Sequence, residues 1–351
     1  MTMLFPECAI EQDISAAHKA HKYCAVEICA GGGGQALGVE KSGFVHVACV
    51  EYEDVFCETL RRNRPRWNVI CDDIRNLNGY DFSGCDLLAG GVPCPPFSIA
   101  GKQLGNLDER DMFPHALRLV REMAPRAVML ENVKGLMAKK FDAYRAGIVA
   151  ELERCGYEVQ YRVLEASDYG VPQLRPRFVL VALRPEDMAN FAWPEPCQGK
   201  TLLADAIGDL LEANGWDAKR FRDAALDVAP TLVGGSKKHG GPDLGPTRAR
   251  AQWRKLGIDG RGVVADAPGA DFAVDGLPRL TLRMVARIQG FPDDWEFCGR
   301  KTLQYRQIGN AFPPPIAEAV SGKIKLAFQT TDRAARRAAR TEKRHAARQR
   351  V

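Results

Sequence analysis

Short apolar segments alternate with amphipathic ones along the first half of the chain. Amphipathic stretches such as DERDMFPHALRLVREM, at residues 108–123, separate segments with strand patterns. This alternation predicts an α/β fold: a doubly wound, mostly parallel sheet with helices on both faces. In such sheets ligands bind beyond the carboxyl ends of the strands. The strand patterns occur at residues 23–30, 44–51, 85–91, 126–132, 158–166 and 177–183, with a further one ending at the CDDIR motif.

The pattern changes near residue 185. Residues 185–278 are rich in Gly, Pro, Asp and charge, which predicts a smaller, loop-rich domain. Ordered patterns then return, ending in a helix with apolar residues at steps of four. We therefore expect residues 1–184 and 279–330 to form the sheet domain and residues 331–351 to form a basic tail.

Composition narrows the class of protein. The chain has 351 residues, of which 46% are hydrophobic, and no apolar run approaches the ~18 residues that a membrane span needs. Its first residues lack the apolar core of a secretory signal. The 11 cysteines form no CxxC pair, which argues against a disulfide framework or a zinc ribbon, so we predict no metal and a reducing cytoplasm.

The net charge of +5 is concentrated at one end. Residues 332–351 hold eight Lys or Arg and two acids, which leaves the rest of the chain near −1. A solvated, partly helical end is the preferred interpretation of this tail, and nonspecific phosphate contact is the alternative. Charge alone therefore does not mark the folded part as a nucleic-acid-binding domain.

A glycine-rich loop follows the first predicted strand in AVEICAGGGGQALG. Such a loop lets the backbone approach a ligand at a helix N-terminus, and Glu51, twenty residues after Gly31, ends the next strand, where an acid can bind ribose hydroxyls. This pattern fits NAD, FAD or S-adenosylmethionine. Tyr52 offers a ring face to adenine, and Asp73 either accepts from the adenine amino group or caps a helix.

The stretch GGVPCPPFSIAG holds Cys94 between prolines after the fourth strand. That stiff frame suits a thiol that must point in one direction, as a nucleophile does. Glu131 ends the next strand, where partial burial would raise its pKa and suit it to donate a proton. Arg175 and Arg177 flank a proline and should point to one side. Each of these charged residues also has a plain structural interpretation, as a helix cap, an ion pair or a surface charge.

Together these segments resemble the cytosine-C5 DNA methyltransferases of the bacterial restriction–modification type. The resemblance covers about residues 25–183 and 279–323, and it implies an S-adenosylmethionine-dependent, Rossmann-like catalytic domain. The region between the two parts stands where that family has its target-recognition domain. The motifs occur in the family's order: EICAGGGGQALG, GGVPCPPFSIAGKQ, ENVKG, DYGVPQLRPRFVLVAL, RLTLRMVARIQGFP and QIGNAFPPP.

The resemblance implies a mechanism in which the target cytosine is flipped out of the duplex. Cys94 would add to C6, Glu131 would bind the ring N3 and the exocyclic amine, Arg177 would hold O2, and Arg175 would support this arrangement. The cofactor would be S-adenosyl-L-methionine. The positions that match the family's cofactor contacts are Cys29, Gly31, Gly32, Gly34, Glu51, Tyr52, Asp73, Ile74, Gly91, Pro93, Asn310 and Ala311.

The chain departs from the family pattern at three positions. Many members have Asp and Phe where this chain has Glu27 and Cys29, so Tyr52 is expected to carry more of the stacking on adenine. Pro95 stands where some members have Gln. The candidates for DNA contact lie in the expected target-recognition domain and just after it; they are Lys237, Lys238, His239, Arg248, Arg250 and Arg279. Each of them is equally consistent with a solvated surface residue.

Three other functions share some of these features. A nicotinamide-dependent oxidoreductase would use the glycine loop and Glu51 but would not need Cys94, Glu131 and the arginine pair. A transfer-RNA methyltransferase would use the same chemistry, and a nonenzymatic DNA-binding regulator would be expected to lack Cys94 or the glycine loop. The sequence therefore predicts a monomeric, cytoplasmic DNA methyltransferase that acts on double-stranded DNA. It belongs either to a restriction–modification system, with a cognate restriction endonuclease as its partner, or to a solitary methylation system.

Overall fold

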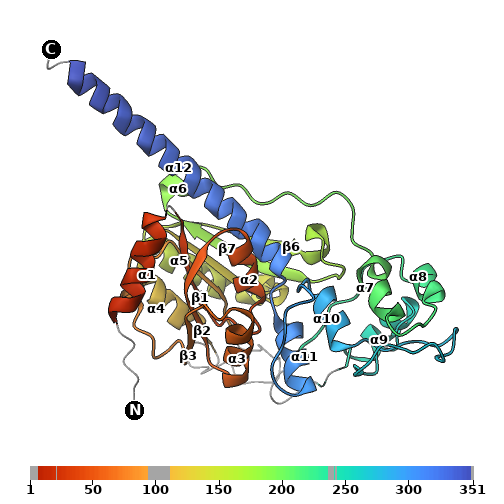
Figure 1. Ribbon diagram of the computed structural model, residues 1–351. Coiled ribbons are helices and arrows are strands. Elements are labelled where there is room, and N and C mark those ends of the chain that lie inside the picture. Colours follow the sequence, from red (N-terminus) through yellow and green to blue (C-terminus); the bar gives the residue numbers. More distant parts are fainter. Residues whose placement is uncertain (1–6, 21, 94–110, 236–240, 242, 349–351) are drawn as a thin grey trace.

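A single seven-stranded sheet forms the centre of the computed structural model (Figure 1). The structure describes residues 7–20, 22–93, 111–235, 241 and 243–348. The strand order is β3-β2-β1-β4-β5-β7-β6; β1 to β5 run parallel, and β7 is antiparallel to both its neighbours. The predicted fold class is confirmed. The strands are β1 (Cys24–Ile28), β2 (Val45–Glu51), β3 (Val69–Cys71), β4 (Leu87–Gly91), β5 (Ala127–Val133), β6 (Glu158–Glu165) and β7 (Pro176–Leu183).

Helices cover both faces of the sheet. One face packs against α1 (Glu7–Lys19), α4 (Phe113–Met123) and α5 (Asp142–Arg154), and the other packs against α2 (Gly34–Lys41) and α12 (Pro314–Arg348). Along β1, Val26 and Ile28 belong to the apolar cluster on the face covered by α1, α4 and α5, whereas Ala25 belongs to the cluster on the face covered by α12. Burial on both faces explains why the central strands are almost continuously apolar rather than alternating.

The second half of the chain builds a helical unit beside the sheet, on the right of Figure 1. One apolar cluster, with Trp253, Trp216 and Trp295 among its largest members, unites the unit and reaches the loop after β1. Residues 279–310 contact both parts of the molecule: α10 packs against α7 and α11, while the Trp295 ring N–H donates to the Gly32 carbonyl and the Glu296 N–H donates to Asn63. The expected domain bounds stay a prediction. The helices of the second half are α6 (Pro185–Met188), α7 (Leu203–Glu212), α8 (Lys219–Ala224), α9 (Thr247–Lys255), α10 (Leu282–Ile288) and α11 (Lys301–Asn310). In the first half, α3 (Asp54–Asn63) lies beside β2 and β3. Short 3-10 turns occur at Gly79–Phe82, Lys134–Met137, Lys139–Phe141 and Ala166–Tyr169.

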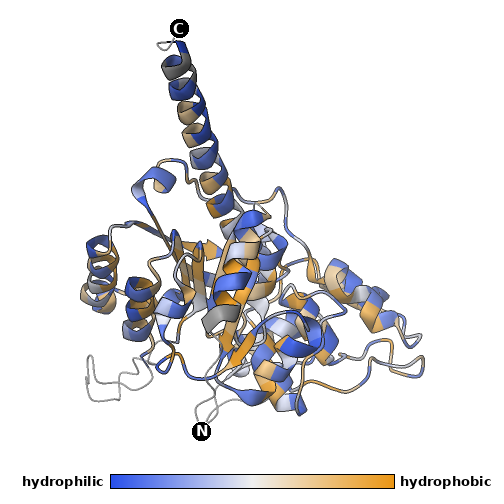
Figure 2. Ribbon diagram, turned by 60° about the vertical axis from the view of Figure 1, so that its left-hand side comes forward, coloured by the Kyte–Doolittle hydropathy of each residue, from blue (hydrophilic) through white to orange (hydrophobic). Residues whose placement is uncertain are grey.

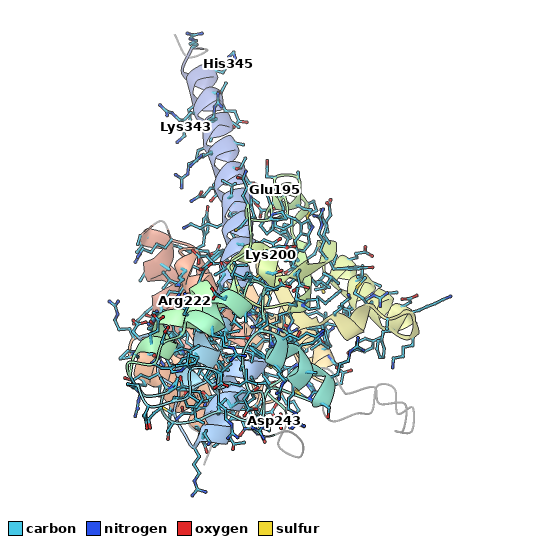
Figure 3. All side chains as sticks on the ribbon, turned by 90° about the vertical axis from the view of Figure 1, so that its right-hand side faces the viewer. Glu195, Lys200, Arg222, Asp243, Lys343 and His345 are labelled. Carbon is cyan, nitrogen blue, oxygen red and sulfur yellow. The ribbon has the colours of Figure 1, made fainter. Side chains whose placement is uncertain are left out.

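The expected basic tail is a direct continuation of α12. Near its emergence from the body, Asp332 accepts a hydrogen bond from the Tyr23 hydroxyl at 2.6 Å and pairs with Arg126 at 2.9 Å. Beyond this anchor the helix is exposed and hydrophilic, and Lys343 and His345 stand far from the sheet (Figures 2 and 3). No helix in the described part of the chain is long and apolar enough to cross a membrane.

Close packing of α2 on α12 gives a testable prediction. A Cβ added at Gly38 would lie 2.4 Å from the Pro314 carbonyl oxygen and 2.5 Å from the Ala317 Cβ. Gly38→Ala should therefore lower the free energy of unfolding by about 1–3 kcal/mol, measured by urea denaturation.

Gly147→Ala is the matched control. Gly147 is exposed within α5 and its added Cβ would meet nothing within 4 Å, so the substitution should raise the free energy of unfolding by up to about 1 kcal/mol. Equal effects at the two positions would contradict the packing of α2 on α12.

Candidate active site

The loop between β1 and α2 is shaped by what packs against it. Gly33 has φ 88°, and a Cβ there would lie 2.6 Å from the Trp295 ring. A Cβ at Gly34 would lie 2.4 Å from the Phe312 carbonyl oxygen. By contrast, a Cβ at Gly31 would meet nothing within 4 Å, because that residue faces open space. The glycines therefore let the helical unit close on one side of the loop and leave the other side open.

Glu51, at the carboxyl end of β2, holds this loop in place. One carboxylate oxygen accepts the Gly31 N–H at 2.7 Å, and the other accepts the Glu53 N–H at 2.9 Å. Burial raises the pKa of Glu51, and these backbone N–H groups oppose the shift. The residue predicted to bind ribose thus also fixes the backbone that surrounds the ligand site.

Two adjoining cavities, of about 400 and about 330 Å³, open at the carboxyl ends of the strands. Cys29, Glu51, Tyr52 and Pro93 line both. All twelve residues predicted to contact the cofactor line one cavity or the other; in the first are Gly31, Gly32, Gly34, Gly91, Asn310 and Ala311, and in the second are Asp73 and Ile74.

Some of these residues already have protein partners. Both carboxylate oxygens of Asp73 bind Arg75, at 2.7 and 3.0 Å, and the Asn310 amide donates to the Gly235 carbonyl at 3.1 Å. Tyr52 is 58% exposed. Cys29 has φ 53°, a left-handed conformation that costs energy for a residue other than glycine. Backbone strain is therefore stored where the two cavities meet.

Three buried acceptor side chains on the first cavity were not predicted. Both carboxylate oxygens of Glu27 and the amide oxygens of Gln35 and Gln307 have no hydrogen-bond partner among the described residues. Burial raises the pKa of Glu27 well above its usual range, and the charge of Glu131 adds to the shift. A charged residue inside an apolar strand was the sequence signal for Glu27. Because unpaired buried acceptors are costly, this wall of the cavity suits a ligand that carries hydrogen-bond donors or positive charge.

Glu131 and Arg177 meet at the same edge of the sheet. In the strand ladder Glu131 is opposite Gly91 on β4 and Val179 on β7, and its Oε1 lies 2.9 Å from the Arg177 Nε. Both side chains are about 10% exposed. Burial raises the pKa of Glu131, although the nearby Arg177 and Arg175 charges oppose the shift. The pair thus combines a carboxyl group that can retain a proton with a cation beside it.

Arg175 is fully buried and has a different set of partners. Its guanidinium donates to the backbone carbonyls of Leu232 at 2.7 Å, Gly309 at 2.6 Å and Ala311 at 3.0 Å. These carbonyls belong to the segment before α9 and to the end of α11, so one side chain joins β7 to both. Arg175 therefore holds together the backbone around the first cavity.

The predicted nucleophile, Cys94, lies outside the described residues, and so do Lys237, Lys238 and His239. The chain is described up to Pro93, which lines both cavities. The preceding residue, Val92, accepts a hydrogen bond from the Asn132 amide at 2.8 Å. The segment that leads to Cys94 is therefore tied to the residue next to Glu131.

The described DNA-contact candidates are spread over two segments. Arg248 is exposed and Arg250 half-buried on α9. Arg279 pairs with Asp259 at 3.0 Å, and Arg261 binds the same carboxylate. Hydrogen bonds from Arg261 and Arg279 lower the pKa of Asp259 to about 2. Arg279 is thus partly neutralised by a neighbour, whereas Arg248 stands open to solvent.

Comparison with known proteins identifies the family. The model of the C-5 cytosine-specific DNA methylases matches residues 23–326. The chain belongs to this family. It is a DNA cytosine-C5 methyltransferase, and its methyl donor is S-adenosyl-L-methionine.

Two relatives cover most of the chain. Type II methyltransferase M.NaeI of Lentzea aerocolonigenes is 54% identical over 86% of this chain and 75% of the relative. Type II methyltransferase M.NgoMIV of Neisseria gonorrhoeae is 51% identical over 88% of this chain and 99% of the relative. A solved structure of Spodoptera frugiperda DNMT2 has a TM-score of 0.60 and 20% sequence identity to this chain, over 88% of this chain and 100% of that one. This likeness shows the shared fold.

The residues of the first cavity fit this methyl donor. Its amino group is a cationic donor and its sulfonium carries positive charge. On one wall Glu27, Gln35 and Gln307 provide acceptor oxygens that have no hydrogen-bond partner among the described residues. The exposed backbone at Gly31 allows close approach of a ligand on another. The chemistry of these residues therefore suits S-adenosyl-L-methionine in the first cavity.

The partners of Arg175 lead to a second prediction. Arg175→Met should lower the free energy of unfolding of the methylase by more than about 3 kcal/mol, because three charge-assisted hydrogen bonds to buried carbonyls disappear. Chemical denaturation measures this change. Arg254→Met, at an exposed site on α9, is the control and should change stability by less than about 0.5 kcal/mol. A small effect at Arg175 would show that its buried bonds do not hold these segments together.

Proposed function

We propose that this methylase is a type II enzyme of a restriction–modification system, which methylates one cytosine in a short, specific duplex sequence. Its similarity to two type II methyltransferases, at 54% and 51% identity over most of the chain, supports this proposal. A restriction endonuclease that cuts the same sequence is its expected partner. A monomer in the bacterial cytoplasm is the expected form.

The chemistry is assigned to groups at the carboxyl ends of β4 and β5 and at the amino end of the antiparallel β7. The Cys94 thiolate attacks C6 of the flipped cytosine and forms a C–S bond, while the protonated Glu131 donates to ring N3. Arg177 stabilises the charge that develops on O2. S-adenosyl-L-methionine, when bound, supplies the methyl group that C5 accepts. A water molecule then takes the C5 proton, the C–S bond breaks to release the Cys94 thiolate, and N3 returns its proton to Glu131. Arg175 is a positioning residue.

The Glu131–Arg177 pair is the observation that carries this assignment. A buried carboxyl group with a raised pKa lies 2.9 Å from a guanidinium, directly across from the strand that leads to Cys94. An enzyme that only bound nucleotides would have no need for such a costly pair. Proton donation to N3 and charge stabilisation at O2 require these two groups at adjacent ring positions.

Residues 185–278 are assigned to recognition of the DNA sequence. From α7 to α9 this region forms the helical unit beside the sheet, whereas Met188 and Trp193 pack on the sheet face with α12. Arg248 is exposed on α9 and has no ion-pair partner among the described residues. Lys237, Lys238, His239, Arg250 and Arg279 are the other candidates for phosphate or base contact. The cofactor contacts are assigned to the twelve cavity residues named above.

Methyl transfer from labelled S-adenosylmethionine tests the function. We expect label in unmethylated duplex DNA and not in transfer RNA, and bisulfite sequencing should place it at one short recurring sequence. Glu131→Gln should lower the transfer rate by about 10²–10⁴, because glutamine cannot donate the proton to N3.

Glu186→Gln, at an exposed site on α6, is the control and should keep the full rate. DNA that contains 5-fluorocytosine should trap a covalent adduct with the parent enzyme and none with Cys94→Ala. Label confined to RNA, or a Glu131→Gln variant that keeps more than a tenth of the rate, would contradict these assignments.

Tyr52 provides a prediction for the cofactor site. Tyr52→Ala should weaken S-adenosylmethionine binding by about two- to twelvefold, equivalent to the ~0.5–1.5 kcal/mol of an aromatic stacking contact. Isothermal titration calorimetry measures the dissociation constant. Tyr80→Ala is the matched control, since Tyr80 is 67% exposed and lines neither cavity. Equal affinities for the two variants would remove Tyr52 from the adenine contact.

A further inference from the structure

Three side chains with metal-binding atoms meet at the opposite end of the sheet from the cofactor cavities. His18 lies in the last turn of α1, Cys24 is the first residue of β1, and Asp86 immediately precedes β4. Because Ala25 is opposite Leu87 in the β1–β4 ladder, Cys24 and Asp86 are neighbours across the two strands. The apolar face of α1 packs on the sheet and brings His18 to them.

The separations of the three ligand atoms match one face of a tetrahedron around zinc. His18 Nε2 lies 3.0 Å from Asp86 Oδ2 and 3.8 Å from Cys24 Sγ, and Cys24 Sγ lies 3.4 Å from Asp86 Oδ2. With bonds of about 2.0–2.1 Å to nitrogen and oxygen and about 2.3 Å to sulfur, tetrahedral zinc separates N and O by about 3.3 Å, S and O by about 3.5 Å and S and N by about 3.6 Å. Each pair is within about 0.3 Å of these values.

Charge and supporting contacts also suit a divalent cation. A thiolate and a carboxylate would neutralise its two positive charges, which matters because Cys24 is fully buried and the Asp86 side chain is 12% exposed. The Cys24 backbone N–H donates to Asp86 Oδ2 at 2.8 Å and so orients that ligand. His18 is 44% exposed and lines a surface cavity of about 560 Å³, so its imidazole can be reached from solvent.

We propose that His18, Cys24 and Asp86 form a zinc site, with a water molecule as the fourth ligand. On binding, the Cys24 S–H bond breaks, its proton passes to solvent, and the sulfur lone pair forms the Zn–S bond. The His18 proton moves to Nδ1, which frees the Nε2 lone pair for zinc. The mixed nitrogen, oxygen and sulfur set favours zinc over magnesium or calcium, which prefer oxygen ligands alone.

The site would join α1 to the sheet. His18 precedes the part of the chain that matches the family model, which begins at residue 23, whereas Cys24 and Asp86 lie inside it. Zinc would therefore attach an element outside the matched region to two central strands. This role is independent of methyl transfer, because the cofactor cavities open at the carboxyl ends of the strands and the zinc ligands lie at the amino ends of β1 and β4.

Metal analysis of the full chain tests the proposal. After removal of metals and dialysis against zinc, the protein should retain one equivalent of Zn²⁺. His18→Gln, which replaces a partly exposed ligand, should weaken zinc binding by at least about tenfold, and Cys24→Ala should do the same. Zinc should also raise the melting temperature of the parent protein and slow hydrogen exchange in α1, and neither effect should appear in His18→Gln.

Cobalt(II) identifies the ligands directly. It should produce the visible bands of tetrahedral cobalt and a sulfur-to-cobalt charge-transfer band that disappears in Cys24→Ala. His345→Gln and Cys155→Ser are matched controls at a remote histidine and cysteine and should leave both signals unchanged. Cys57 and Cys71, with thiols 2.7 Å apart, are a competing place for a thiolate-bound metal. No retained zinc, or zinc binding that survives both His18→Gln and Cys24→Ala, would overturn the proposal.

Discussion

The buried guanidinium of Arg175 connects the parts of this protein that must stay together. It leaves the sheet at the start of β7 and donates to carbonyls of Leu232, Gly309 and Ala311, which belong to segments far apart in the chain. Those segments carry Asn310 and Ala311 into the first cavity. A fully buried cation is tolerated only when it is well hydrogen-bonded, so its position and that of the three carbonyls are coupled. The shape of the cavity follows from this coupling.

The cavity itself is electrostatically incomplete. Glu27 and Glu131 are both buried and both have raised pKa values, but only Glu131 has a cationic neighbour among the described residues. Glu27 lacks a hydrogen-bond partner there, as do the oxygens of Gln35 and Gln307. Two acidic groups in one site are thus given different surroundings, one facing the space for a cationic ligand and the other held by Arg177. When two carboxyl groups in one site have different surroundings, one can bind a ligand while the other transfers a proton.

The two ends of the sheet serve different purposes. The carboxyl ends of the parallel strands collect glycines and acids, Glu131 among them, around open cavities, as expected for a parallel sheet. Arg177 reaches Glu131 there from the amino end of the antiparallel β7. The amino ends of β1 and β4 collect His18, Cys24 and Asp86 under the end of α1. Sites at opposite ends of the same strands can change independently, since Cys24 begins the five-residue strand β1 and Cys29, in the cavity, follows its last residue.

The sequence by itself determined the features that depend on neighbouring residues. Continuous apolar runs predicted the strands because both faces of the sheet are buried, and the ordered motifs placed Glu131, Arg177 and the glycine loop at strand ends. Only the tertiary structure decided which distant groups meet. The bonds of Arg175 to Gly309 and Ala311, the packing of α10 on α7, and the approach of His18 to Asp86 across 68 positions depend on how the elements pack. Local sequence carries no record of such contacts, because they form between surfaces that exist only once the helices have packed on the sheet and on one another.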